Sequence, residues 1–310
     1  MSLVVASLLH VVALAVLPFV VVGVINRTKS LWAGRKGPPV LQLAYDVARL
    51  LRKRSVYSET TSFVFRLGPW VVLASSLVSG FVAPFLAVRA PLSFSFDFVW
   101  FAYVWGLGRV ALMLGALDTG SSFEGMGASR EATFAAILEP AFFLVAGATC
   151  LVTHERGFGA VLALRATEGT AFVVWLASVV ALFVLVQVES ARMPVDDPTT
   201  HLELTMVHEV MILDHGGREL AALQAASAAK LTVGLGIIAT LVNPLAARAA
   251  PIATAAVNVG LILLLAVAIG TVESLVARLK LRAVPQYIVV ALVAGAVALL
   301  ATTWGGGRAG

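Results

Sequence analysis

Eight long apolar runs constrain this fold more than any other feature of the sequence. They lie at about 3–25, 69–89, 97–118, 131–153, 169–189, 228–246, 251–275 and 284–304. Each is near the ~20 residues that a helix needs to cross ~30 Å of hydrocarbon. Charged residues make up only 13% of the chain, about half their usual share in soluble domains. The pattern predicts an all-α polytopic membrane protein, with residues 1–310 forming a single integral membrane domain. The first run has neither preceding basic residues nor a small-residue cleavage site, so we expect it to be retained.

The basic residues predict how the chain is oriented in the membrane. Loops at about 26–68, 119–130 and 190–230, with a short one at 276–283, hold 16 of the 22 Lys and Arg residues. The positive-inside rule places these loops in the cytoplasm and both termini outside. They also explain the net charge of +5 without nucleic acid as a partner.

The first of these loops contains apolar side chains at helical spacing after Pro38 and Pro39, which predicts an amphipathic helix. Two interpretations of this helix stay open. It could lie at the lipid interface with basic anchors, or it could dock a soluble partner.

Several functional classes are excluded by what the sequence lacks. A single cysteine, Cys150, cannot form an internal disulfide or hold an iron–sulfur cluster alone. We find no nucleotide fingerprint and no nucleophile motif, so we do not expect a single-chain enzyme. His201, His208 and His215 are spaced by seven, about 10.5 Å along a helix, which is too far for one metal ion. We expect them to be surface residues that hydrogen-bond a partner. A stand-alone ion transporter is disfavoured because the two halves show no repeat of broken helices.

Five charged side chains fall inside or at the ends of the apolar runs. Arg109 is about midway through the third run and Glu139 is well inside the fourth, whereas Glu189, Lys230 and Glu273 are near the predicted cytoplasmic ends of later runs. A charge at the centre of a membrane helix costs a few kcal/mol on insertion scales. The pattern favours a polar cavity that opens inward, with Arg109 as its deepest charge. Alternatively, the last three are ordinary interfacial charges that reach the headgroups.

Two loop stretches carry further polar density. "LDTGSSFEGMGASREATF" predicts a tight irregular surface, packed against another protein, that includes Asp118, Glu124, Arg130 and Glu131. "VQVESARMPVDDPTTHLE" places four carboxylates at the end of the fifth run: Glu189, Asp196, Asp197 and Glu203.

Three stretches carry a family resemblance: "GRKGPPVLQLAYDVARLL", "ALDTGSSFEGMGASREATFAAILEP" and "ESARMPVDDPTTHLELTMVHEVMILDHGG". From the first run to about residue 281, the chain resembles the membrane subunit common to formate hydrogenlyase and other group 4 membrane-bound [NiFe] hydrogenases. That subunit is itself similar to the eight-span heel subunit in the membrane arm of proton-pumping NADH–quinone oxidoreductase. The resemblance implies a non-catalytic subunit of the cell inner membrane. It would anchor a peripheral large subunit and a small iron–sulfur subunit, beside antiporter-like membrane subunits, and couple them to proton or sodium movement. Iron–sulfur clusters, and a [NiFe] site if one is kept, would belong to those partners, with no cofactor in this chain.

The resemblance and the charged residues within or at the ends of the apolar runs together predict residue roles. A proton path is predicted for Glu139, Arg109, Glu189, Glu203, Lys230 and Glu273. Partner docking is predicted for Asp118, Glu124, Arg130, Glu131, Arg192, Asp196, Asp197 and Asp46. For Arg192, Asp196 and Asp197 a purely structural role in docking ion pairs stays open. The quinone-reducing branch has an acidic Glu-Ala-Glu segment and a Glu-Tyr-Ser-Gly run where this chain has "DDPTTHLELTMVHEVMILDHGG". We therefore assign no quinone, and the heel subunit of a quinone-reducing, NADH dehydrogenase-like complex is the alternative.

Overall fold

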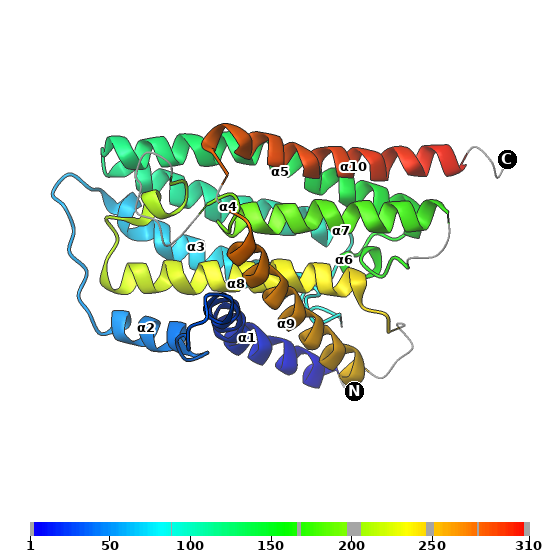
Figure 1. Ribbon diagram of the computed structural model, residues 1–310, viewed down its shortest axis with the longest axis horizontal. Coiled ribbons are helices and arrows are strands. Elements are labelled where there is room, and N and C mark those ends of the chain that lie inside the picture. The colour runs from blue at the N-terminus through cyan, green and yellow to red at the C-terminus, as the bar shows by residue number, and fades with distance from the viewer. Residues whose placement is uncertain are drawn as a thin grey trace.

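The chain forms a bundle of long helices (Figure 1). The computed structural model describes residues 3–87, 89–165, 169–196, 206–245, 251–277 and 279–306. Its α-helices are α1 (Leu3–Trp32), α2 (Gln42–Leu51), α3 (Phe63–Val82), α4 (Asp97–Asp118), α5 (Ser122–Thr153), α6 (Phe158–Val161), α7 (Thr170–Glu189), α8 (Gly217–Val242), α9 (Pro251–Leu275) and α10 (Val284–Gly306). Two short 3₁₀ helices, η1 (Glu209–Ile212) and η2 (Leu281–Ala283), precede α8 and α10. Within the described ranges eight helices are long and apolar enough to cross a membrane, which confirms the predicted class.

Three helices begin earlier than the apolar runs predicted. α5 begins at Ser122 rather than 131 and α8 at Gly217 rather than 228, so much of the predicted loops 119–130 and 190–230 is helical. Both extensions carry a carboxylate in the first turn, Glu124 and Glu219, where the helix dipole favours negative charge. α3 begins at Phe63 rather than 69, because the Ser62 hydroxyl accepts a 3.2 Å hydrogen bond from the Val64 amide.

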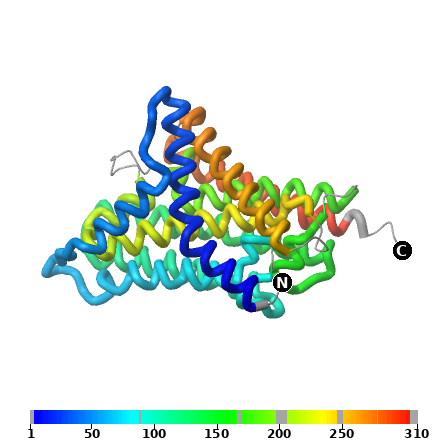
Figure 2. Tube along the Cα trace, turned by 90° about the horizontal axis from the view of Figure 1, so that it is seen from below, coloured from blue at the N-terminus to red at the C-terminus, as the bar shows by residue number. Residues whose placement is uncertain are grey.

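α8 occupies the centre of the bundle. Of its most apolar window, 78% is buried, against at most 50% in any other long helix of the described chain. α3, α4, α5, α7 and α10 run roughly alongside it, with α10 packed on α5 and α7. α1 and α9 pack on each other and cross the bundle obliquely (Figure 2). Any charged residue in the middle of α8 is therefore surrounded by other helices.

Irregular backbone follows α3 and lies inside protein. Its carbonyl groups, and that of Gly80 in the last turn of α3, are bound by side chains from three other helices. His10 Nε2 lies 2.8 Å from Gly80 O, Thr240 donates to Pro84 O at 2.8 Å, and Asn258 donates to Phe85 O at 2.6 Å. Non-helical backbone at membrane depth is tolerated only when its polar groups are satisfied in this way.

The predicted amphipathic helix is α2, which begins at Gln42, three residues after Pro39. It packs against α8 and α1, and none of its residues is fully buried. The segment before it approaches α1 closely: a Cβ added at Gly23 would lie 1.8 Å from Val40 O. α2 is therefore fixed to the bundle at the predicted cytoplasmic end.

Candidate functional site

Arg109 of α4 stands at the centre of a cluster of buried ion pairs. Its guanidinium contacts three carboxylates: Glu139 at 2.6 Å, Glu131 at 3.5 Å, and Glu189 through Nη2. Glu131 and Glu139 both project from α5, and Glu189 is the last residue of α7. Only 6% of the Arg109 side chain is exposed. A planar guanidinium with five donors is the side chain best suited to bind several carboxylates at once.

Lys230 extends the cluster to the central helix α8. Its Nζ lies 2.5 Å from Glu189 Oε2 and 5.3 Å from the centre of the Trp105 ring. Ion pairs among the described residues thus join three carboxylates and two cations from four helices. The cluster borders a small cavity of about 40 Å³, also lined by Asp196 and His208. This volume is enough for a few ordered waters.

Four of the six residues predicted for a proton path therefore meet at one place: Arg109, Glu139, Glu189 and Lys230. Glu131 joins them, although the sequence suggested a docking role for it. Glu131 lies about two helical turns before Glu139 on α5, so helical spacing alone could have placed both carboxylates on one face. The predicted span began only at Glu131, and that residue was therefore assigned to the loop.

Glu273 belongs to a second ion-pair group. Its fully buried carboxylate lies 3.0 Å from Lys29 of α1 and 3.6 Å from Arg192 of the segment after α7. The Leu279 amide also donates to Pro194 O at 3.0 Å. This group ties the α1–α9 pair to the 190–196 segment. Glu203, the remaining predicted path residue, and Asp197 lie outside the described residues.

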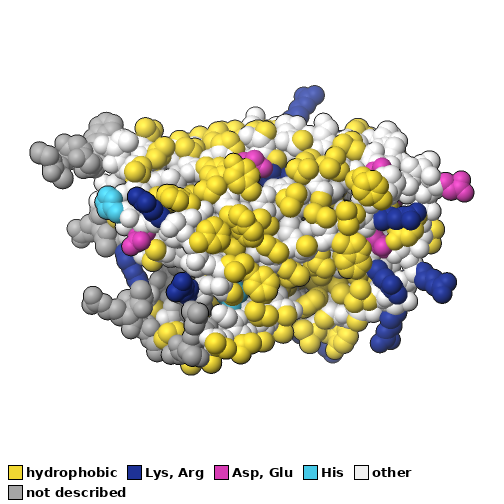
Figure 3. All heavy atoms as spheres, turned by 180° about the vertical axis from the view of Figure 1, so that it is seen from behind, with side chains coloured by type: hydrophobic (Ala, Val, Ile, Leu, Met, Phe, Trp, Pro, Cys, Tyr) yellow, Lys and Arg dark blue, Asp and Glu magenta, His cyan; other side chains and the backbone are white. Residues whose placement is uncertain are grey.

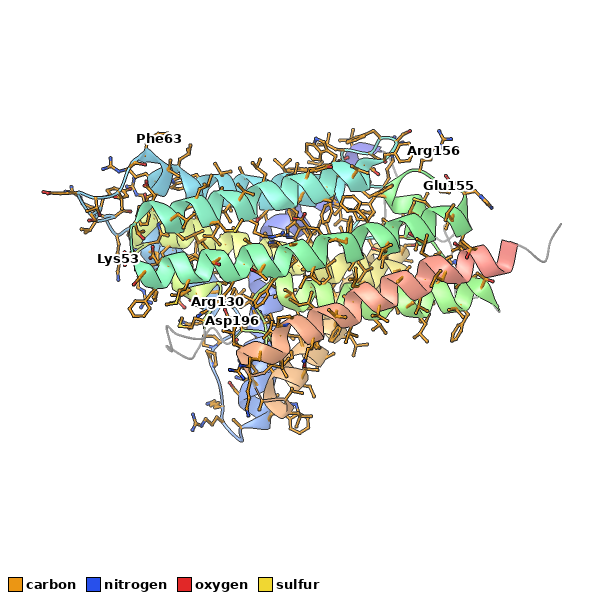
Figure 4. The ribbon with its side chains drawn as sticks, turned by 90° about the horizontal axis from the view of Figure 1, so that it is seen from above. Lys53, Phe63, Arg130, Glu155, Arg156 and Asp196 are labelled. Carbon is orange, nitrogen blue, oxygen red and sulfur yellow. The ribbon has the colours of Figure 1, made fainter. Side chains whose placement is uncertain are left out.

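The segment after α7 is fixed by hydrogen bonds to neighbouring backbone. The Asp196 carboxylate accepts from the amides of Val207 and His208 at 3.0 and 2.9 Å. Arg130 donates to Met206 O at 2.7 Å, and Figure 4 shows Arg130 and Asp196 toward the same end of the bundle. The two side chains therefore hold residues 206–208 in place beside the ion-pair cluster.

The other predicted docking residues also make bonds within the chain. Asp118 accepts from the Ser62 and Phe65 amides at 2.7 and 3.2 Å, which joins α4 to the start of α3. Glu124 is buried and accepts from the Asp214 amide at 3.4 Å. Asp46 accepts from Arg49 at 2.9 Å on α2. The stretch that was predicted to be an irregular surface is helical from Ser122 onward, because it forms the first turns of α5. Docking by these residues stays a prediction.

Two of the three histidines differ from their predicted surface positions, because His208 is half-buried and His215 is buried. His201 lies outside the described residues. His215 is 5% exposed and stacks on Phe65, with ring centres 4.0 Å apart. Burial lowers the pKa of His215 to about 4, and burial followed by the Lys230 charge does the same for His208. Both are therefore neutral near pH 7. Burial, reinforced by Asp196 and opposed by Arg192, raises the pKa of Glu209 to about 7. Over the described ranges no group of three such side chains could hold a metal ion.

A second cavity leads from the α2 side toward the cluster. It encloses about 260 Å³ and is lined by residues that include Asn26, Arg192, Glu209 and Gln224. It shares the wall residues Ala191, His208, Leu223 and Ser227 with the small cavity beside Arg109. Polar side chains thus extend from the predicted cytoplasmic end to the deepest charge.

Eight apolar helices around buried ion pairs define a polytopic membrane protein with an ionisable interior. The profile of the family described as NADH dehydrogenase matches residues 3–304. The chain belongs to that family.

Two curated relatives from Escherichia coli K12 match part of the chain. It is 32% identical to hydrogenase-4 component C over 142 residues, which cover 46% of this chain and 45% of that protein. It is 34% identical to formate hydrogenlyase subunit 4 over 122 residues, which cover 39% of this chain and 40% of that one. The matched part thus spans less than half the length of either relative.

One solved structure has the same fold. It is a chain of the membrane-bound sulfane sulfur reductase, an archaeal respiratory membrane complex. The TM-score is 0.76 over 96% of this chain and 100% of that chain, with 16% identity.

Proposed function

We propose that this chain is a non-catalytic membrane subunit of a multisubunit, hydrogenase-type respiratory oxidoreductase. In this function it anchors a peripheral electron-transfer module on its cytoplasmic loops. It also couples electron transfer in that module to the movement of protons or sodium ions across the cell inner membrane. The family membership and the similarity to hydrogenase-4 component C and formate hydrogenlyase subunit 4 support this class of complex.

The buried cluster around Arg109 is the observation that carries the coupling role. Three carboxylates share two cations, and two of the carboxylates, Glu131 and Glu189, line the small cavity beside Arg109. In such a cluster a change in one neighbouring charge alters how strongly the carboxylates bind protons. Redox changes in a docked module could therefore load or unload a proton here. The 206–208 segment, held by Asp196 and Arg130, connects this place to the predicted docking surface.

The proposed partners hold the cofactors. A peripheral hydrogenase-like large subunit and a small iron–sulfur subunit would carry the iron–sulfur clusters, and a [NiFe] site if one is kept. Antiporter-like membrane subunits would sit beside this chain in the bilayer.

The alternative is the heel subunit of a quinone-reducing complex, which the family description supports. The 260 Å³ cavity on the α2 side is the place in the described chain where we would expect such a ligand to bind. Quinone bound in the purified complex, or inhibition by quinone-site inhibitors, would select this alternative over the hydrogenase type.

The coupling role is tested by Glu139→Gln in the intact complex reconstituted into vesicles. We expect proton translocation per electron to fall several-fold, because the substitution removes a titratable group from the cluster. Glu155→Gln, at an exposed site at the other end of the bundle, serves as the control. Unchanged translocation at unchanged turnover for Glu139→Gln would contradict the role of that residue.

A further inference from the structure

A groove on the side of the bundle, between α4 and α5, opens directly onto the ion-pair cluster. It encloses about 560 Å³. Arg109 and Glu189 line it, together with Glu139. The cluster is therefore open sideways, toward the surroundings of the bundle.

Glu139 is the charged side chain that the groove leaves uncovered. It is 54% exposed, whereas Arg109 and Glu189 are each 6% exposed. Glu139 lies 14 residues before the end of α5 at Thr153, which is ~21 Å of helix. This depth is well inside a ~30 Å hydrocarbon layer. The face in Figure 3 shows acidic and basic atoms together within a wide hydrophobic band.

The charges of the cluster are not balanced within the described chain. Its ion pairs join Arg109 and Lys230 to Glu131, Glu139 and Glu189, so carboxylates exceed cations by one. Glu131 and Glu189 are largely enclosed by the chain. Glu139 pairs with Arg109 at 2.6 Å on one side but is 54% exposed, so it is the carboxylate of the cluster that a cation or hydrogen-bond donor from outside can reach.

The groove is lined by small residues as well as by larger ones such as Tyr103 and Phe143. Small residues line it on both sides: Ala102 and Gly106 on α4, and Ala132, Ala135 and Ala136 on α5. Small residues at membrane interfaces let helix backbones approach closely. An acyl chain could fill the same space, but it has neither a positive charge nor a hydrogen-bond donor for a carboxylate. A charge that faces lipid in mid-membrane is costly, and such charges are normally covered by protein.

We propose that this groove is the docking site for a transmembrane helix of a neighbouring membrane subunit, and that the helix presents a Lys, Arg or His side chain to Glu139. This inference rests on the proposed function, because it assigns one of the partner contacts of the complex. The occupant completes the cluster electrostatically and covers Glu139 against lipid.

Filling the groove tests the proposal. In the complex purified in mild detergent, Ala136→Phe is expected to reduce the amount of one co-purifying membrane subunit at least tenfold and to leave the peripheral subunits bound. Ala256→Phe, at an exposed alanine on α9, is the matched control. Full retention of every membrane subunit in Ala136→Phe overturns the proposal.

A second measurement identifies the occupant even if Ala136→Phe fails to assemble. A photo-crosslinking amino acid replaces Ala136 in the otherwise native complex. The expected adduct joins a transmembrane helix of another subunit that has Lys, Arg or His within about one turn of the crosslink. Adducts with lipid alone, or with a helix that lacks such a residue, overturn the proposal.

The two proposals fail separately. If Glu139→Gln keeps full translocation while the crosslink is found, the coupling role is wrong and the docking site stands. If Glu139→Gln uncouples the complex while Ala136→Phe retains every subunit, the docking site is wrong and the coupling role stands.

Discussion

Arg109 shows how much a single residue can organise inside a membrane protein. Depth along the apolar runs predicted that Arg109 and Glu139 need partners, whereas Glu189 and Lys230 could equally have been interfacial charges. The structure pairs all four with one another. Sequence could not predict which pairs form, since spacing within one run says nothing about the vertical register between different helices. Glu131 was missed as a cluster member because the predicted span began at that residue, which placed it at the membrane edge rather than inside the helix.

Replacing Arg109 by Gln should strongly destabilise the protein. The substitution leaves Glu131 and Glu189 buried near one remaining cation, and breaking a buried ion pair costs about 3–5 kcal/mol. We expect a clearly lower unfolding midpoint in detergent, followed by tryptophan fluorescence. Arg156→Gln is the control, because that guanidinium only lies over the Phe96 ring at 5.7 Å. The double variant Arg109→Gln with Glu131→Gln should recover part of the loss. Equal stability of Arg109→Gln and the unmodified protein would refute the pairing.

His215 should make stability depend on pH. Its folded-state pKa of about 4 is below its ordinary value of 6.5, so the unfolded chain binds the proton more readily. The free energy of unfolding therefore falls as pH drops from about 6.5 to 4, by up to about 3 kcal/mol from this residue. His215→Phe keeps the stacking on Phe65 and should flatten that part of the profile.

Unfolding midpoints measured between pH 7 and pH 4 check this expectation. His154→Asn, at an exposed site, should leave the slope as it is. An unchanged slope in His215→Phe would show that the residue does not carry the effect.

At the scale of elements, the number and type of the membrane helices followed from the sequence, but several of their ends did not. Hydropathy detects the part of a helix that lipid requires to be apolar. α5 and α8 continue beyond that part, with Glu124 and Glu219 in their first turns. These extensions place charged residues of the supposed loops into the folded core.

Close helix packing makes Gly236 of α8 sensitive to substitution. A Cβ at this position would lie 2.7 Å from Phe85 O and 2.9 Å from Phe85 Cα, in the irregular segment after α3. We expect Gly236→Ala to destabilise the protein by about 1–3 kcal/mol through overpacking. Gly260→Ala on α9 is the matched control, since a Cβ there meets nothing within 4 Å. It should be neutral or slightly stabilising. Thermal unfolding of both variants in the same detergent compares them, and equal midpoints would contradict the packing argument.

At the scale of the whole molecule, the orientation in the membrane rests on the basic residues alone. The structure groups the 52–62 connection, α2 and the start of α5 at one end and Glu155 at the other (Figures 1 and 4). The positive-inside rule assigns the first end to the cytoplasm.

Labelling with a membrane-impermeant thiol reagent tests this orientation. In a Cys150→Ser background, Glu155→Cys should react in intact cells, whereas Glu59→Cys should react only in inverted vesicles or after permeabilisation. Both positions are exposed, so a difference in labelling shows on which side of the membrane each cysteine lies and does not result from burial. The reverse pattern would place both termini in the cytoplasm.

The contact of Glu273 with Lys29 and Arg192 has a consequence for biogenesis. The fully buried carboxylate on α9 is matched by cations from α1 and from the segment after α7, and both of these leave the ribosome first. Both cations are therefore synthesised before α9 enters the translocon. We therefore expect Glu273 to pair with Lys29 and Arg192 as α9 inserts, so that its carboxylate does not enter lipid without a counter-charge.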